Sequence, residues 1–352
     1  MIPAALIPTP DTIPVPWGWF EILKLATFAC HLLLMNAVFG GAILALIRGK
    51  GNDTGPQLAG RLPTTLALTV NLGVPPLLFL QVLYGQFLYT AAVLSAVYWM
   101  ALVGLVMAAY ALLYVHAGRV KKQSANALTA LALPLAVLAL LGTSFILTNI
   151  MTLKLRPEVW PEYFQNAAGT ILNLSDPTLI PRWLHFVFSA AAVGGLFSAI
   201  LAHKAAKAGD SAARARMQSG LAWFTHVTVA QIGIGFWWLV TLPREIMLLF
   251  MGGQALHTAV LVLALVGVGG CLAFGFMKRL WATTAALVVT VCLMIGLRDL
   301  VRMAYLEPYF HPSDLEVTAQ YGPMYFFLIS FVIGIGAIAY MFKLHRQDGG
   351  GI

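Results

Sequence analysis

Four histidines of this 352-residue chain lie within apolar stretches, where an ionisable side chain is costly and indicates function. They occur in "FACHLLLMNAVFGG", "RWLHFVFSAAAVGGLFSAIL", "WFTHVTVAQIG" and "GGQALHTAVLV", as His31, His185, His226 and His257. A neutral imidazole is a ligand for haem iron, and the Gly and Ala residues nearby leave room for a flat macrocycle. The four together predict haem ligation, whereas a lone histidine of this kind is more often a polar contact between helices.

The depth of each histidine within its stretch suggests how the four pair. We expect His185 and His257 to share one haem b, with His257 two to three turns into an apolar stretch that begins near residue 246. His31 is the candidate ligand of a second haem b, with His226 as its possible partner. The sequence leaves open whether one or two haems are bound.

Three arginines are candidates to hold the haem propionates. The stretch "LMIGLRDLVRMAYL" places Arg298 and Arg302 four residues apart, so they share a helix face. Arg182 precedes His185 by three residues. Propionates are carboxylates, and in a medium of low dielectric they need arginine partners. The alternative is an internal pair between arginine and Asp299, with the long side chains reaching toward the membrane surface.

The composition requires a membrane environment for these residues. Hydrophobic residues make up 60% of the chain and charged residues 10%, against about 25% charged in soluble domains. The net charge of +8 fits basic cytoplasmic loops better than a nucleic-acid partner. The three cysteines form no CxxC pair, so the chain carries no c-type haem motif. The proline-rich N-terminus does not resemble a cleaved signal peptide.

The predicted fold is an all-α polytopic membrane bundle that forms one domain over residues 1–352. A spanning helix needs about 20 apolar residues. Nine stretches meet this need: 18–47, 64–90, 93–116, 127–150, 183–203, 219–242, 246–275, 280–304 and 323–343.

The connections between these stretches alternate in charge. One set is basic and includes Arg48, Lys50, Lys121 and Lys204, while the other is mainly acidic and includes Glu158. Because basic loops stay in the cytoplasm, we expect the N-terminus outside and the C-terminus inside. We expect a multi-pass protein of the cell inner membrane, with lipid around it and two long outer loops at about 151–182 and 305–322.

The histidine stretches resemble those of the large, haem-binding subunit of the cytochrome bd quinol oxidases. In that family the fifth helix begins with an aromatic residue and a histidine before a small-residue run, as "RWLHFVFSAAAVGGLFSAIL" does. "SFILTNIM" resembles a fourth-helix motif, "VNLGVPPLLFLQVLYGQF" a second-helix motif, and a first-helix histidine is shared. The resemblance covers residues 20–245 and implies low-spin haem ligation by His185. His257 stands where the family has a methionine ligand, and His31 matches the ligand of a second haem.

The departures from that family change the expected activity. The stretch 93–116 lacks the family's two proton-path glutamates, and the long quinol loop is reduced to "TLPREIM". We therefore expect an electron-transfer subunit that exchanges electrons between quinol or quinone (menaquinone included) and a periplasmic partner such as a c-type cytochrome. Such a subunit would work within a hetero-oligomeric complex. Arg244 and Glu245 are the candidates for the quinol headgroup. The alternatives are a small quinol:oxygen oxidase subunit and a haem-free quinone-binding anchor or transporter.

Overall fold

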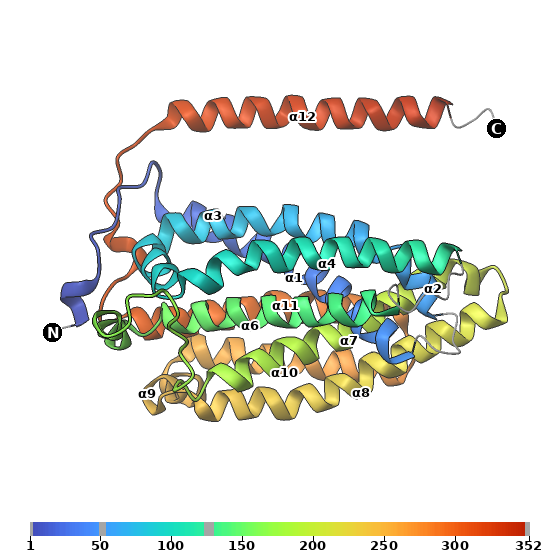
Figure 1. The fold of residues 1–352 in the computed structure, drawn as a ribbon, viewed down its shortest axis with the longest axis horizontal. Helices are drawn as coiled ribbons and strands as arrows, with labels where there is room; N and C mark the ends of the chain where they lie inside the picture. Colours follow the sequence, from blue (N-terminus) through green and yellow to red (C-terminus); the bar gives the residue numbers. More distant parts are fainter. Residues whose placement is uncertain (1–2, 49–53, 123–129, 349–352) are drawn as a thin grey trace.

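The structure is a computed structural model that describes residues 3–48, 54–122 and 130–348. These residues form helices and no strand, and one isolated bridge joins Ile13 to Val317. Long helices run side by side, with their axes along one direction (Figure 1). They are α1 (Trp17–Arg48), α3 (Leu62–Leu94), α4 (Ala96–Lys122), α6 (Ala132–Leu153), α7 (Leu179–Lys207), α8 (Ser211–Thr241), α10 (Ala255–Phe276), α11 (Leu280–Leu306) and α12 (Tyr321–Asp348). The short ones are η1 (Pro3–Leu6), α2 (Thr54–Ala59), η2 (Pro157–Phe164), α9 (Arg244–Leu248), η3 (Leu249–Gly253) and η4 (Pro312–Asp314).

The described residues hold eight helices that are long and apolar enough to cross a membrane. Eight of the nine expected stretches correspond to them, which confirms an all-α multi-pass membrane protein. The remaining expected stretch lies in α8, whose apolar part is interrupted by His226 and Gln231. Helix α8 is nevertheless long enough to cross a membrane, because it has 31 residues and α6, which is a candidate span, has 22.

Helix α8 also connects opposite ends of the bundle. Helix α7 begins at the end of the bundle where α1 begins, which we call the N-terminal end, and α10 begins there too (Figure 1). Helix α7 therefore ends at the opposite end, and α8 must run back along the whole bundle for α10 to begin at the N-terminal end. The described basic connections, such as those with Lys121 and Lys204, accordingly lie at the opposite end. Lys50 lies outside the described residues.

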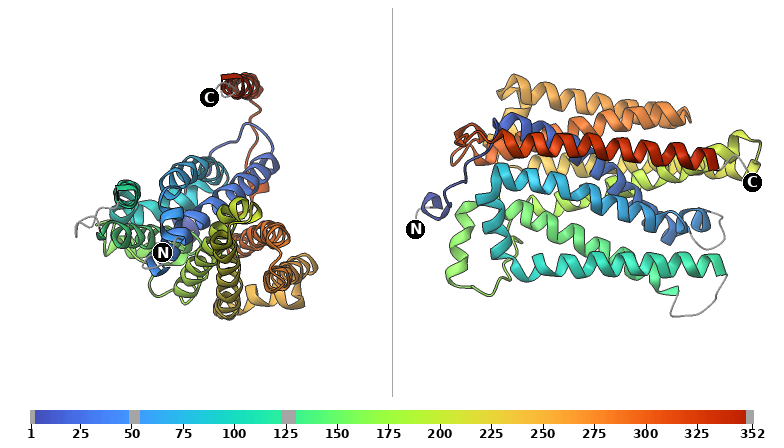
Figure 2. Two further views of the ribbon diagram at one scale, coloured as in Figure 1. Left: turned by 90° about the vertical axis from the view of Figure 1, so that its right-hand side faces the viewer. Right: turned by 90° about the horizontal axis from the view of Figure 1, so that it is seen from above.

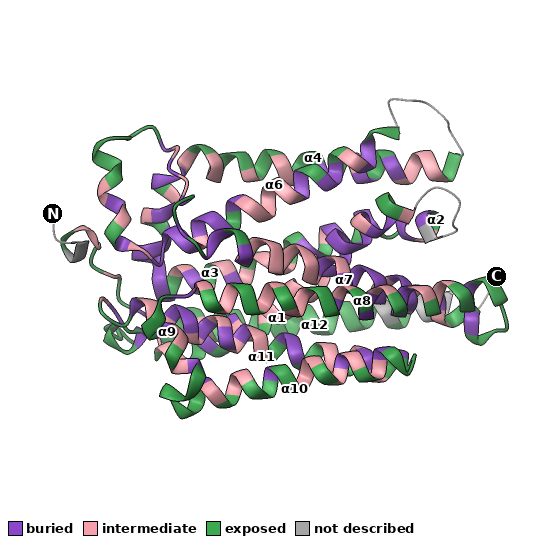
Figure 3. Cartoon of the chain, turned by 90° about the horizontal axis from the view of Figure 1, so that it is seen from below, coloured by how far each residue is buried: buried purple, intermediate pink, exposed green. Residues whose placement is uncertain are grey.

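Close contact between α1 and α7 forms the centre of the bundle. Gly40 of α1 and Gly194 of α7 face each other so closely that a Cβ on either would overlap the backbone of the other helix. Small residues bring helices together in this way inside membranes, where the hydrophobic effect does not drive their association. Helix α1 also packs on α3 and α11. Buried residues gather along these central helices, and exposed ones follow the outer faces of α4 and α10 (Figure 3).

The structure divides the expected stretch 246–275 into two helices. Helix α9 ends at Leu248, a π-type turn covers Leu249–Gly253, and α10 begins at Ala255. Gly252 has φ +107°, a left-handed conformation that glycine adopts without the cost of a Cβ clash. His257 therefore lies in the first turn of α10, and the expected depth of two to three turns is wrong.

Helix α12 stands apart from the rest of the bundle (Figures 1 and 2). The residues of α12 whose burial is described are almost all exposed. A segment after η4 leads to α12 and pairs with the N-terminal segment, since Ile13 N–H donates to Glu316 O at 2.8 Å and Thr318 N–H to Ile13 O at 2.9 Å. The two segments meet at the N-terminal end of the bundle.

Candidate functional site

A buried group of four charged residues joins α1 to α11 near the N-terminal end. The Lys24 ammonium lies 2.6 Å from a Glu21 carboxylate oxygen and 3.0 Å from Asp299 Oδ2. Arg302 pairs with Asp299 on its own helix, and its Nη2 lies 3.9 Å from Glu21 Oε1. All four residues are at most 8% exposed. Because a buried charge is costly unless paired, these contacts fix the register of α1 against α11.

Three cations of this region surround the ring of Tyr84. The Arg302 guanidinium lies 4.5 Å from the ring centre, Lys24 Nζ 5.3 Å and Lys154 Nζ 6.0 Å. Tyr84 is fully buried, and its hydroxyl has no hydrogen-bond partner. The residue interrupts α3 with non-helical φ −139° and ψ 31°. This kink in α3 places the ring among the charged side chains of α1 and α11.

Arg298 and Arg182 differ from Arg302 because neither lies within 4.0 Å of a carboxylate among the described residues. The Arg298 guanidinium lies over Phe28 at 4.7 Å, and that of Arg182 lies over Trp238 at 5.4 Å. Arg182 Nε is buried without a hydrogen-bond partner. Of the three arginines expected to bind propionates, two are thus available, while Arg302 has internal partners.

His31 of α1 has the hydrogen bond that is typical of an iron-ligating histidine. Its Nδ1 lies 2.9 Å from Thr69 O on α3, and donation to that carbonyl leaves Nε2 as a free acceptor. The ring lies against Gly73, where a Cβ would come within 2.8 Å of it. The Phe28 ring stacks on the His31 ring with their centres 6.2 Å apart, and the Arg298 guanidinium lies over the same Phe28 ring.

His185 of α7 has a similar arrangement on the other side of the arginine pair. Its ring faces α8 beside Gly235, where a Cβ would lie 3.2 Å from it. Trp238 stacks on it at 6.5 Å with an interplanar angle of 27°, and the same tryptophan lies under Arg182. His185 Nδ1 is buried without a hydrogen-bond partner. Each histidine is therefore linked through one aromatic ring to one arginine without a carboxylate.

No ring contact joins His257 to His185 or His226 to His31 among the described residues. His257 packs edge-on against Phe250 at 4.9 Å, and its Nδ1 is buried without a partner. Phe250 and Trp238 line one apolar cavity of about 30 Å³, far below the several hundred Å³ of a typical cofactor pocket. His226 is exposed and contacts Ala222 O of its own helix and the edge of Phe276. The predicted pairs His185–His257 and His31–His226 have no direct contact.

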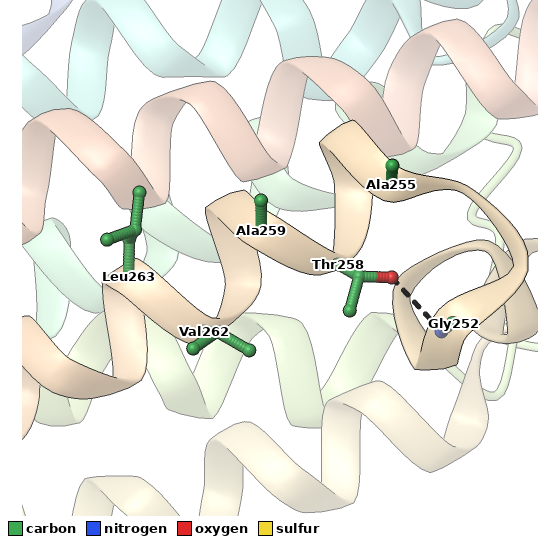
Figure 4. A pocket seen from close by; sticks show the side chains of 6 residues that line it. All are labelled: Gly252, Ala255, Thr258, Ala259, Val262 and Leu263. Atoms are coloured by element: carbon green, nitrogen blue, oxygen red, sulfur yellow. Dashed lines mark hydrogen bonds between the residues drawn. The ribbon is translucent and has the colours of Figure 1, made fainter.

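The two residues expected at the quinol headgroup, Arg244 and Glu245, are exposed at the start of α9. Beyond η3, a shallow groove of about 530 Å³ runs along the outer face of α10. Thr258 contributes its polar atom, which accepts a hydrogen bond from Gly252 N–H at 3.0 Å (Figure 4). The other lining residues are Ala255, Ala259, Val262 and Leu263. The groove can take an apolar chain, and its glycine and alanines leave space for a flat ring.

Two residues of the fourth-helix motif have structural contacts beside the site. Ser144 Oγ accepts a hydrogen bond from Trp183 Nε1 at 2.9 Å, next to Arg182. Asn149 is fully buried, and its Oδ1 accepts from Asn173 N–H at 2.7 Å. These bonds fix the loop before α7 and hence the position of His185.

We did not predict Glu21, Lys24, Tyr84 or Lys154 as site residues from the sequence. Two of them could have been found from their spacing, because Glu21 and Lys24 are three residues apart at the start of an apolar stretch. Lys154 directly follows α6 and is 2% exposed. Nothing in the local sequence indicates that this lysine is buried, since it depends on the loop that covers it.

The donor set contains the side-chain types that haem requires, although the cavity beside His185 and His257 is too small for it. His31 offers a free Nε2 and His185 an unpartnered Nδ1, each beside a glycine, and the two nearby arginines lack carboxylates. No group of three or more His, Cys, Asp or Glu residues that could hold a metal ion occurs in the described part of the chain. Haem iron takes only its axial ligands from the protein. No family model and no curated protein matches this chain.

Proposed function

We propose that this protein is a membrane b-type cytochrome that transfers electrons between a quinol or quinone and a redox partner on the periplasmic face. The observation that carries the proposal is the duplicated arrangement of histidine, aromatic ring and unpaired arginine, His31–Phe28–Arg298 and His185–Trp238–Arg182. A half-buried arginine that contacts no carboxylate is unfavourable, and a ligand that carries both an iron and two carboxylates would satisfy both kinds of residue.

In this proposal His31 and His185 each ligate one haem b, and Arg298 and Arg182 bind propionates. Bound haem would supply the one-electron chemistry. The chain would orient it, neutralise its carboxylates and exclude water, and Ser144 and Asn149 would fix the segment that carries His185. His257 and His226 remain candidates for second axial positions, although neither contacts the first pair of histidines.

The quinol is proposed to bind at the turn between α8 and α10. Arg244 and Glu245 are exposed there, and the groove on α10 begins at Gly252, a few residues further along the chain. The inner membrane, an N-terminus on its outer side, the hetero-oligomeric complex and a c-type cytochrome partner are parts of the same proposal. The alternating charge of the connections supports this orientation, since the described basic ones share one end.

The test is the cofactor content of the purified full-length protein. A pyridine haemochrome assay should give b-type haem, with about two haems per chain if both arrangements bind one. A quinol should then reduce it, while oxygen should not be consumed without a partner subunit. Protein free of a Soret band would refute the proposal and favour the haem-free anchor. Vigorous oxygen uptake by the isolated subunit would instead support the oxidase.

A further inference from the structure

Lys154 is the one lysine of the charged region without a carboxylate or hydrogen-bond partner among the described residues. Its Nζ is buried and lies 6.0 Å from the centre of the Tyr84 ring, at the outer limit of a cation–π contact. Lys24, by contrast, has Glu21 and Asp299 within 3.0 Å. The two carboxylates of the region are already engaged by Lys24 and Arg302, so neither is left to neutralise Lys154.

The surroundings of Lys154 favour the neutral amine. Burial lowers the pKa of Lys154 well below its usual value, and repulsion by neighbouring cations lowers this pKa further. Two neighbours weakly favour the ammonium form instead. They are the face of the Tyr84 ring and the carbonyl end of α6, which Lys154 follows directly. The cations that face it are Arg302, Arg298, Lys24 and Arg182, in decreasing order of effect.

We propose that Lys154 is a redox-linked proton acceptor, neutral while the cofactor is oxidised and protonated when the cofactor is reduced. This inference rests on the proposed function. Lys154 Nζ and the Arg302 guanidinium lie at the same Tyr84 ring, and Arg298, proposed to hold a carboxylate of the cofactor, is one turn from Arg302 on α11, so a negative charge added there acts on the Lys154 amine. When the quinol gives one electron to the cofactor, the Lys154 amine would take one proton from water, form an N–H bond and become an ammonium.

The uptake of one positive charge with each electron removes most of the electrostatic cost of reduction in a medium of low dielectric. It also makes the midpoint potential depend on pH. For a one-electron couple linked to one proton, each tenfold change in proton concentration shifts the potential by about 59 mV. Lys154 thereby gives the protein a way to couple proton movement to electron transfer without the glutamates that the sequence lacks in residues 93–116.

The experiment is a spectroelectrochemical titration of the haem in the full chain between pH 6 and pH 9. Wild type should approach the one-proton slope over part of this range. Lys154→Met and Lys154→Arg should both give a flat profile, with the higher potential in the arginine variant because its positive charge is permanent. Lys207→Met, at an exposed lysine near the opposite end of α7, should retain the wild-type slope.

A second measurement checks the resting state without any redox step. If Lys154 is neutral in the folded protein, the unfolded chain binds more protons below pH 10, and the melting temperature of the oxidised protein should rise with pH from 7 to 9. Lys154→Met should lose this component. An unchanged potential slope in Lys154→Met would overturn the inference and leave the cytochrome intact. Absence of any haem spectrum would overturn both, and the two failures are distinguished by the Soret band.

Discussion

The guanidinium of Arg298 lies 4.7 Å from the centre of the Phe28 ring, and Phe28 stacks on His31 one turn further along α1. An arginine of α11 and a histidine of α1 thus contact the same aromatic ring. The register that allows this is set by Lys24, which bridges Glu21 on its own helix and Asp299 on α11.

We predict that His31→Ala and His185→Ala each remove a different part of the haem spectrum. Each substitution deletes one axial ligand, so the corresponding low-spin signal should fall or become high-spin. The measurement is the optical and EPR spectrum of each variant. His116→Ala, near the opposite end of α4, is the control and should change little. Identical losses in both variants would mean that the two histidines share one iron.

His257→Ala separates the expected bis-histidine haem from two independent sites. His185 packs on Trp238 and His257 on Phe250, and these two rings line one cavity, so a shared haem predicts that the His185 low-spin signal is lost in this variant, whereas independent sites predict that it persists. A comparison of the EPR spectra of His257→Ala and His185→Ala distinguishes one shared haem from two independent sites. Matching spectra would restore the pairing that the sequence suggested.

Lys24→Met should destabilise the protein strongly, by about 3–5 kcal/mol, because Glu21 and Asp299 lose a shared partner while they stay buried. Denaturant unfolding in detergent measures the loss. The double variant Lys24→Met/Asp299→Asn removes one of the stranded charges and should recover part of it. Equal stability of wild type and Lys24→Met would show that the group does not hold α1 to α11.

Gly194→Ala should weaken the packing of α1 on α7. The added methyl group meets the backbone at Gly40, which cannot rotate away, so we expect a cost of about 1–3 kcal/mol. Gly104→Ala on α4 is the matched control, since a Cβ there meets nothing within 4 Å. Thermal unfolding of the two variants compares them. Helix propensity alone favours alanine over glycine at both positions, so a loss of the same size in Gly104→Ala would contradict the packing explanation.

A C-terminal fusion tests the orientation expected from the charged connections. A reporter that is active only in the cytoplasm should work after α12, and an alkaline phosphatase fusion there should be inactive. Phosphatase activity would invert the topology. It would also place the Lys24 and Lys154 region on the cytoplasmic side.

The apolar stretches and their alternating charges were enough to predict the bundle, because length and hydropathy determine which segments span. They could not show the break at Gly252 and Gly253, since an apolar run with two glycines also fits a continuous helix. Helix faces correctly grouped Arg298 with Arg302, but only the contact with α1 shows that Arg302 has carboxylate partners. Lys154 could not be found because its burial depends on residues far along the chain.

The bridge between Ile13 and Val317 has a consequence for how the protein is made. The segment with Ile13 emerges from the ribosome long before Val317, with which it pairs, has been synthesised. The N–H and carbonyl groups of Ile13 therefore remain hydrogen-bonded to water until the segment before α12 has been synthesised. Closure of the N-terminal end is a late event of biogenesis, and a chain cut before residue 315 would leave that end open.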